Sequence, residues 1–509
     1  MVRIYNVDSL KTFDNLAVFH HGTATVQVPP GHYEALCFFV TNSLVTEAMD
    51  PQFTVASSTS VRLDARRATS RVSVSTPKPA SDTVMQVGFG RRDALGQVAP
   101  YGFIGSGRMA FKVQPVTSRV SIGQLYYYVY TRRLSPARVN QAYSYDLEFP
   151  VTGRVPVRQH YTARASSLAS VAATYPADRA GQRSLDTRAG ALAWESSVLS
   201  ADLALITPAR RTEYYTASPA VTWAGVHYQV WIVKAPATLG EIDSSWVSYR
   251  PGEKSSATWA GQPQHPRLLE NKIFIGRTYC PACLSGTTLD LLVFPYADNT
   301  PAHRGYPDAA GAGPHLTESQ SYDVYADGRR VSKGTGFFQE SVTLPGGTRT
   351  LSIDYDTVRS APYFTLSTRA DTRWTVPTRT IPLPHGWYCT LANQTNCAVL
   401  PLLFADYRLP VNLLGQLRPG RVTASVAVSH LAAAAIGVRS VRVSVSFDGG
   451  SSWKRAFVVR AGRGRYALAF SVPVAARTDG FGAIRLKATD AGGGTLRQTV
   501  RRAFAVVPR

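Results

Sequence analysis

The strongest constraint on the fold is a two-residue alternation of apolar and polar side chains, clearest in the last hundred residues. In VRSVRVSVSFDGGSSW, the side chains of Val441, Val443, Val445 and Phe447 fall on one side of an extended chain. The DGG sequence that follows is typical of a tight turn, and RYALAFSVP then repeats the period. Successive side chains of a β-strand point to opposite faces, so a period of two indicates strands with one buried face. This part of the chain is therefore predicted to be a meander of short strands.

Similar alternating segments, separated by turns, continue along most of the 509 residues and predict an all-β protein of several β-sandwich domains in tandem. The Pro- and Ser-rich segment 75–82 is predicted to be a linker at a domain boundary, and the stretch 162–182 is one of the few that are irregular or compatible with a helix. We predict four domains: a transthyretin-like β-sandwich at 1–75, a second β domain at 83–204, a jelly-roll or galactose-binding-like β domain at 205–400, and an immunoglobulin- or fibronectin-III-like β-sandwich at 401–509.

The charge of the chain does not point to a nucleic-acid partner, although the formal net charge is +22. Proteins that bind nucleic acids group their basic residues on one face, often among aromatic side chains. Here no basic run exceeds two residues, and the arginines are spread over the alternating segments, as expected for solvated strand faces. Apolar runs such as ALCFFV are also far shorter than the roughly 20 residues of a membrane-spanning helix, so no membrane span is predicted.

The five cysteines indicate the cellular compartment in which the protein resides. Cys37 lies in an apolar segment and is expected to be a buried free thiol, while Cys280 and Cys283 (CPAC) and Cys389 and Cys397 (CTLANQTNC) form two close pairs. Two local disulfides are the preferred interpretation, and they indicate an exported, extracellular protein. A zinc site and a redox C-x-x-C remain alternatives, but the long gap of the second pair and the absence of a βαβ pattern favour neither. No cofactor is predicted.

The N-terminus leaves the route of export open. MVRIYNVDSL lacks the basic and apolar segments of a signal peptide. The chain is therefore either cytoplasmic or a piece of a longer secreted precursor, and the sequence does not decide whether Met1 is the true start.

The segment HHGT, at residues 20–23, is the one stretch that suggests a catalytic base. A histidine before Gly-Thr occurs in subtilisin-like peptidases, where it begins a helix and works with an aspartate and a serine. Here His21 leads instead into ATVQV, which we predict to be a strand at 24–28, and the aspartate and serine elements of that family are missing. We therefore predict that His21 is a loop residue and that this chain has no catalytic residues.

Two other short motifs are structural. The sequence VQVPPGHYEA resembles a signature of transthyretin-like, carboxypeptidase-regulatory-like sandwiches, in which Pro29, Pro30 and Gly31 would shape a turn and Tyr33 would pack inward. The sequence SFDGGSSW resembles the Asp-box of sialidases, in which Asp448 would accept backbone hydrogen bonds and Trp453 would pack beneath the turn. The tryptophans are interpreted as core or interface residues, with a sugar-stacking platform as the alternative.

Several longer stretches resemble the non-catalytic C-terminal region of actinobacterial subtilisin-like (subtilase) serine peptidases, among them RIYNVDSLKTFDNLAVFHHGTATVQVPPGHYEAL, PARRTEYYTASPAVTWAG and VRVSVSFDGGSSWKRAFVV. The peptidase domain of that family is absent, so no catalytic residue is carried over. The resemblance implies a secreted accessory region that stabilises a peptidase domain or binds its protein substrate or a cell-wall glycan. A stand-alone carbohydrate-binding or adhesin-like protein is the alternative, and an unrecognised hydrolase is the third. The ligand and the oligomeric state are not determined by the sequence.

Overall fold

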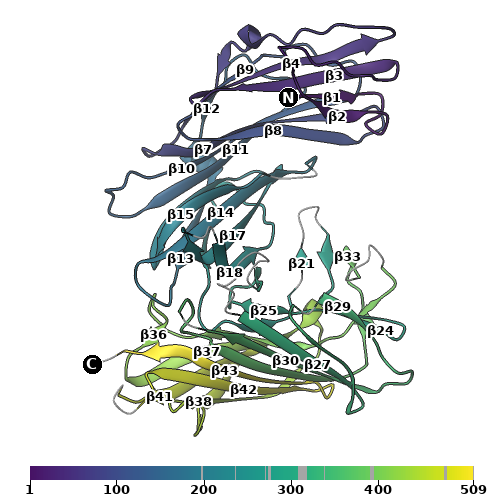
Figure 1. Cartoon of the computed structure of the whole chain (residues 1–509). Helices are drawn as coiled ribbons and strands as arrows, with labels where there is room; N and C mark the ends of the chain where they lie inside the picture. Colours follow the sequence, from purple (N-terminus) through teal and green to yellow (C-terminus); the bar gives the residue numbers. More distant parts are fainter. Residues whose placement is uncertain are drawn as a thin grey trace.

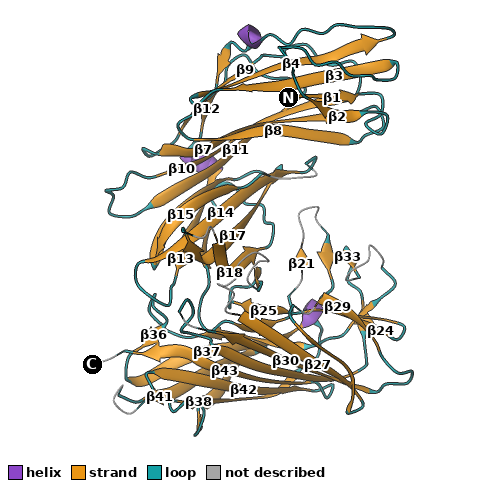
Figure 2. Cartoon of the chain, viewed as in Figure 1, coloured by secondary structure: helices purple, strands orange, loops and turns teal. Residues whose placement is uncertain are grey.

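A computed structural model of the chain describes residues 1–195, 199–234, 237–269, 271–272, 277–307, 318–337, 339–360, 362–389, 395–474 and 478–507. Its regular structure is β-strand apart from short 3-10 turns at Ala65–Arg67, Ala165–Ser167 and Leu431–Ala433 (Figure 2). The prediction of an all-β protein made of packed sheets is confirmed. Within the described residues, no helix is long and apolar enough to span a membrane.

The N-terminal half is a stack of three sheets (Figure 1). The outer sheet has the order β2-β1-β3-β4-β9-β5, and its strands are β1 (Val2–Asn6), β2 (Asp14–Ala17), β3 (Gly31–Val40), β4 (Leu44–Val55), β5 (Ser70–Arg71) and β9 (Ala110–Val113). The middle sheet has the order β19-β13-β16-β11-β10-β7-β8, and its strands are β7 (Ser81–Arg92), β8 (Val98–Ser106), β10 (Gln124–Leu134), β11 (Tyr143–Thr152), β13 (Leu168–Tyr175), β16 (Ala209–Thr216) and β19 (Lys254–Thr258). The inner sheet has the order β15-β14-β17-β18-β26, and its strands are β14 (Gln182–Leu192), β15 (Ala201–Thr207), β17 (Val221–Ile232), β18 (Ala237–Ser244) and β26 (His303–Gly305).

The middle sheet is buried on both faces. Toward the outer sheet, Phe89 and Tyr127 join one apolar core with Leu36. Toward the inner sheet, Tyr130 packs against Trp223, with ring centroids 6.1 Å apart. A strand covered on both sides needs apolar residues at consecutive positions, which explains the run LYYYVY in β10.

The C-terminal half is a β-sandwich whose larger sheet has nine strands (Figure 1). Its strands are β27 (Glu318–Ala326), β28 (Arg329–Thr335), β30 (Thr350–Arg359), β31 (Arg369–Pro377), β36 (Gln416–Leu417), β38 (Val438–Ser446), β39 (Lys454–Arg455), β42 (Phe481–Asp490) and β43 (Thr495–Val506). The facing sheet contains β35 (Leu403–Arg408), β37 (Gly420–His430), β40 (Phe457–Gly462) and β41 (Arg465–Val472). As the alternation predicted, Val443 and Val445 are buried between these sheets, together with Leu468 and Phe470.

Smaller sheets complete the fold. One contains β29 (Gln339–Thr343), β24 (Thr288–Leu292), β23 (Ala282–Ser285), β34 (Ala398–Val399) and β32 (Ile381–Pro382). The others pair β6 (Ser73–Ser75) with β12 (His160–Thr162), β20 (His265–Arg267) with β25 (Phe294–Ala297), and β21 (Asn271–Lys272) with β22 (Thr278–Tyr279) and β33 (Trp387–Tyr388). Both predicted disulfides are present, Cys280–Cys283 and Cys389–Cys397, and Cys37 is a buried free thiol.

Two predictions of secondary structure are wrong. Residues 24–28 alternate in burial, and Ala24 packs against the apolar core of the outer sheet, but the segment pairs with no described strand and so forms none itself. The stretch 162–182 contains β13, a strand that pairs with β16 on one side and with β19 on the other. Its small residues are compatible with a helix in isolation, but long-range pairing holds them extended.

The division into four domains stays a prediction, and backbone pairing crosses its boundaries. β9 joins the outer sheet, β16 and β19 join the middle sheet, and β31 pairs with β43. Strands assigned to neighbouring domains therefore share sheets.

Candidate functional site

One hollow, the central pocket, lies beside the inner sheet where β17, β18 and β19 meet the loop before β26. Its volume is about 150 Å³. Aromatic side chains form much of its wall, namely Tyr215, Trp223, Tyr249 and Trp259, and hydroxyl groups come from Ser244, Ser245, Ser255, Ser256 and Thr300. Ser255 and Ser256 are exposed on β19, the edge strand of the middle sheet, so the pocket opens at that edge.

Behind the pocket, six buried charges form the central ion network: Arg132, Arg188, Arg211, Asp146, Asp186 and Glu213. Asp186 binds all three guanidiniums, with its carboxylate 2.7 Å from Nη1 of Arg188 and 2.5 Å from Nη2 of Arg211. Glu213 lies 2.6 Å from Nη2 of Arg211 and accepts a hydrogen bond of 2.7 Å from the Tyr215 hydroxyl. The network joins the middle sheet to the inner sheet.

The network keeps two of its acids ionised. Burial alone would raise the pKa of Glu213, but Arg188 and Arg211 outweigh it and lower this pKa to about 2. The same arginines, with Arg132, hold the pKa of Asp186 below its ordinary value in spite of burial. For Asp146 burial outweighs Arg132, and the pKa is raised. Each guanidinium is thus matched by carboxylates of the protein itself.

Arg188 and Glu213 reach the pocket wall, but their polar atoms are already engaged. Arg188 donates to the Tyr215 hydroxyl at 3.0 Å, to the Thr187 carbonyl at 2.8 Å and to the Tyr175 hydroxyl at 2.9 Å. Gly225 allows this arrangement, because a Cβ at that position would lie 2.5 Å from Arg188 Nη1. The charges that line the pocket therefore hold the sheets together, and they are not free for a ligand.

A second part of the wall is built on Trp259. Arg188 lies over its ring at 4.4 Å and His303 stacks on it with centroids 4.2 Å apart. The Trp259 indole N–H is buried and has no hydrogen-bond partner among the described residues. His303 Nδ1 lies 3.1 Å from the Asp298 carboxylate, which also accepts hydrogen bonds from the Ala260 and Thr300 amides.

The His303–Asp298 pair has the orientation of a catalytic base, but the nucleophile of a triad is not engaged. Asp298 fixes the imidazole with Nδ1 toward the carboxylate, as the orienting acid of a triad does. In the part of the chain that the structure describes, His303 Nε2 makes no hydrogen bond to a serine or threonine hydroxyl. No group of three or more His, Cys, Asp or Glu residues suited to a metal ion occurs among the described residues.

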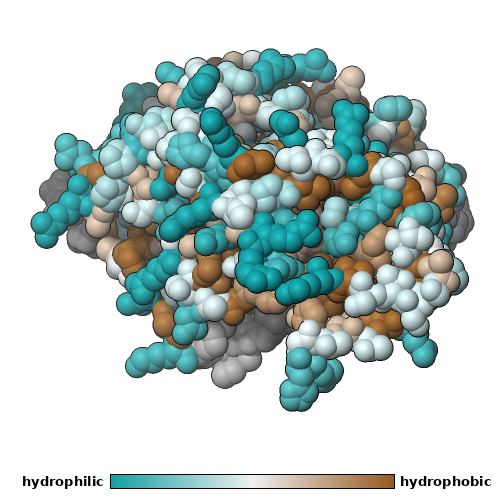
Figure 3. Space-filling view, turned by 90° about the horizontal axis from the view of Figure 1, so that it is seen from above, coloured by the Kyte–Doolittle hydropathy of each residue, from teal (hydrophilic) through white to brown (hydrophobic). Residues whose placement is uncertain are grey.

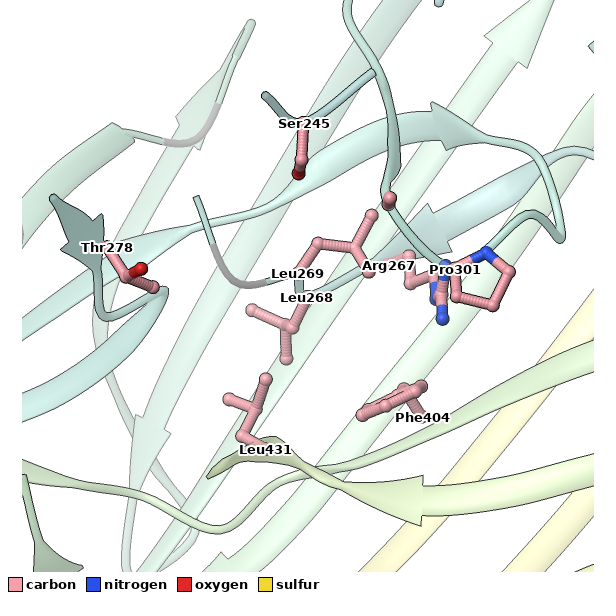
Figure 4. A pocket seen from close by; sticks show the side chains of 9 residues that line it. Ser245, Arg267, Leu268, Leu269, Thr278, Pro301, Phe404 and Leu431 are labelled. Carbon is pink, nitrogen blue, oxygen red and sulfur yellow. The ribbon is translucent and has the colours of Figure 1, made fainter. Parts of the chain in front are cut away.

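A larger hollow lies next to the central pocket, and Figure 4 shows the side chains that line it. Its volume is about 330 Å³, and Leu268, Leu269, Phe404 and Leu431 supply most of its wall. Arg267 is its one charged residue, and its guanidinium is paired with Asp406 at 2.8 Å. Both hollows share Ser245 and Ala302.

The motifs singled out in the sequence lie elsewhere. His21 is exposed in a turn with φ +50°, as predicted for a loop residue. Asp448 accepts hydrogen bonds from the Ser452 amide and from the Ser446 hydroxyl, and Trp453 donates to the Gly450 carbonyl, so this turn is structural. Pro29 and Pro30 precede β3, which begins at Gly31, and the buried Tyr33 donates to the Pro29 carbonyl. None of these residues lines either hollow.

The pocket residues were missed because they come from seven separate strands and the segments between them. A partial signal was present in two alternating polar segments, D-x-R at 186–188 and R-x-E-x-Y at 211–215. Alternating opposite charges on one face of a strand suggest a buried ionic ladder when the surrounding strands are apolar.

Polar and charged side chains are scattered over the described surface. From above, over the N-terminal strands, polar side chains interrupt the apolar ones across the visible face (Figure 3). This agrees with the even distribution of arginines in the sequence.

Comparison with known proteins leaves the family open. No family model matches the chain, and no curated protein matches it. Among solved structures, the chain is similar to the four N-terminal immunoglobulin domains of Sidekick-1, at 9% identity over 86% of this chain and 96% of that one. The TM-score is 0.14, which is too low to relate the two arrangements of sheets.

Proposed function

We propose that this chain is a non-catalytic binding region of an extracellular protein, accessory to a subtilisin-like peptidase. The observation that carries the proposal is the chemistry of the central pocket, whose charged groups are saturated by one another while aromatic rings and hydroxyls remain for contact. Acid–base catalysis needs titratable groups that can exchange protons with a substrate, whereas recognition needs shape, stacking and neutral hydrogen bonds. The link to a peptidase comes from the sequence resemblance, and the two disulfides support an oxidising compartment.

The test combines labelling with binding. Purified chain is treated with a fluorophosphonate serine probe and separately incubated with insoluble cellulose, chitin, bacterial sacculi and immobilised casein. We expect no covalent label and retention on at least one polymer. Labelling of a serine would overturn the non-catalytic function, and retention on none of the polymers would overturn the binding function.

The extracellular assignment has its own measurement. Thiol counting on denatured protein isolated from culture medium is expected to find one free thiol, that of Cys37, and four oxidised cysteines. Reduction of the denatured chain, followed by removal of the reductant, provides the control with five free thiols. Five free thiols without reduction would contradict the assignment.

A further inference from the structure

We infer that the central pocket binds the neutral sugar ring at one end of a glycan, and that it excludes acidic sugars. This deepens the proposed function and rests on it, since it names the ligand of a binding region. Three features of the pocket support the inference. They are its small volume, the hydrogen-bonding groups of its wall that remain available to a ligand, and the charged groups of its wall that are already paired.

The size of the pocket limits the ligand to a single ring. Pockets for drug-sized ligands measure roughly 300 to 1,000 Å³. The central pocket is about 150 Å³, so it accommodates one ring and leaves the remainder of a polymer outside. The mouth beside Ser255 and Ser256 is exposed, which gives a chain attached to that ring a way out.

The hydrogen-bonding groups of the pocket wall that remain available to a ligand suit the hydroxyls of a sugar. The Trp259 indole N–H is a buried donor without a partner among the described residues, and an unpaired buried donor destabilises the fold. A ligand oxygen that accepts this hydrogen bond would relieve that destabilisation. With Nδ1 of His303 hydrogen-bonded to Asp298, Nε2 is the ring nitrogen that remains for contact with a ligand hydroxyl. Ser244 Oγ accepts from the Gly225 amide at 2.8 Å, and its O–H is left to donate.

The wall also supplies apolar contact. Tyr249 is half-buried near the mouth and stacks on Tyr215 with centroids 5.2 Å apart, and Tyr215 lies 5.3 Å from Trp223. The C–H faces of a pyranose pack on such aromatic surfaces while its hydroxyls point to polar groups at the rim. Donors, acceptors and rings thus lie together around one small volume.

The charges argue against an acidic ligand. A carboxylate or sulfate would need an uncommitted cation, and an arginine fork binds such groups through two free N–H donors. Arg188 is the one guanidinium in the wall, and its donors are engaged by Tyr215, Thr187, Tyr175 and the network acids. Glu213 lies in the same wall and would repel an anion. The pocket is therefore selective for neutral sugars.

The experiment titrates the full chain with soluble hexasaccharides by isothermal titration calorimetry. The probes are cellohexaose, maltohexaose and chitohexaose, which are neutral, and hexagalacturonate, which is acidic. At least one neutral hexasaccharide is expected to bind, and hexagalacturonate is expected to bind at least tenfold more weakly. Absence of binding by all three neutral probes, or equal binding of the acidic one, would overturn the inference.

Three variants locate the site. Ser256→Trp places a bulky ring at the mouth from an exposed position and is expected to weaken binding at least tenfold. Lys254→Trp is the matched control, because Lys254 is exposed on the same strand and does not line the pocket; binding is expected to stay within twofold of the parent. Trp259→Phe keeps a ring but removes the N–H, with about a tenfold loss expected. Unchanged binding in both Ser256→Trp and Trp259→Phe would place the ligand elsewhere.

The outcomes separate this inference from the proposed function. Retention on casein or sacculi without binding of any neutral hexasaccharide would remove the sugar pocket and leave a binding region. Retention on none of the polymers together with silent titrations would remove both. Circular dichroism and thermal unfolding of each variant show that the fold is retained before binding is compared.

Discussion

Two groups of buried carboxylates in this protein differ in how many arginines offset their negative charge. Between the middle and inner sheets, the central ion network matches three acids with three arginines, and the pKa of Glu213 falls to about 2. Between the outer and middle sheets, Glu34 is paired with one guanidinium, that of Arg91 at 2.9 Å, and Glu47 has no arginine partner among the described residues. Burial raises the pKa of Glu34 to about 7 against the opposing effect of Arg91. Burial also raises the pKa of Glu47 to about 8, although a hydrogen bond from the Gln114 amide acts to lower it.

Burial is similar in the two groups, so it does not explain the difference. Glu34, Glu47, Asp186 and Glu213 are all at most 1% exposed. The number of arginines in contact decides the charge state, since each guanidinium offsets the desolvation cost of a carboxylate only at hydrogen-bond distance. A third pair supports this interpretation. Glu148 and Glu195 also lie at the interface of the middle and inner sheets, without an arginine partner among the described residues, and burial raises the pKa of both.

Removing a cation from the matched group should have the largest effect. In the Arg211→Met variant, Asp186 and Glu213 lose a partner and stay buried, so we expect a loss of about 3–5 kcal/mol in the free energy of unfolding. Arg210→Met is the control, because Arg210 is the exposed neighbour on β16, and a change within about 0.5 kcal/mol is expected. Urea unfolding at pH 7 measures both. Equal losses would show that the network does not stabilise the sheets.

Neutralising an acid of the poorly matched group should stabilise the protein. Glu47→Gln removes a carboxylate that must hold a proton to be buried, so we expect a gain of about 2 kcal/mol at pH 8 and little change at pH 4. Unfolding by urea at both pH values tests this. A gain at pH 4 as large as that at pH 8 would mean that the effect comes from packing and not from ionisation.

The two groups should respond to pH in opposite ranges. Glu34 and Glu47 bind protons in the folded chain up to about pH 7 to 8, but in the unfolded chain only to about 4.5. Their contribution is therefore greatest below pH 4.5 and is lost as the pH rises toward 8. Glu213 has a lowered pKa of about 2, so its contribution is constant above pH 4.5 and is lost only in stronger acid.

Hydrogen exchange resolves the two regions separately. After correction for the intrinsic rate, protection of β4 amides is expected to fall by about tenfold between pH 5 and pH 8, and protection of β16 amides is expected to fall by less. Parallel losses in β4 and β16 would contradict the difference in charge state.

The smallest effect is expected from Arg91. In Arg91→Met, Glu34 loses its cation but can take up a proton, so the cost should be about 1–2 kcal/mol at pH 8 and less at pH 5. Arg92→Met, at the exposed neighbour on β7, is the control and should have little effect at either pH. A loss as large as that of Arg211→Met would show that one arginine compensates as well as three.

The sequence by itself determined the local structure. The alternation of Val441, Val443 and Val445 specified strands with a buried face, and the short spacing of the cysteine pairs specified two local disulfides. Both are properties of neighbouring residues, which a single chain displays without knowledge of its partners.

The tertiary structure alone decided which strands are neighbours, and so which faces are buried and where the pocket lies. β11 runs parallel to β16 and β13 runs parallel to β19, although about 70 and 84 residues separate their positions in the sequence. The stacking of the sheets then brings Arg132 to Asp186 and covers both faces of β10. No local pattern encodes these arrangements, because the free energy that selects them comes from burying whole sheets against one another.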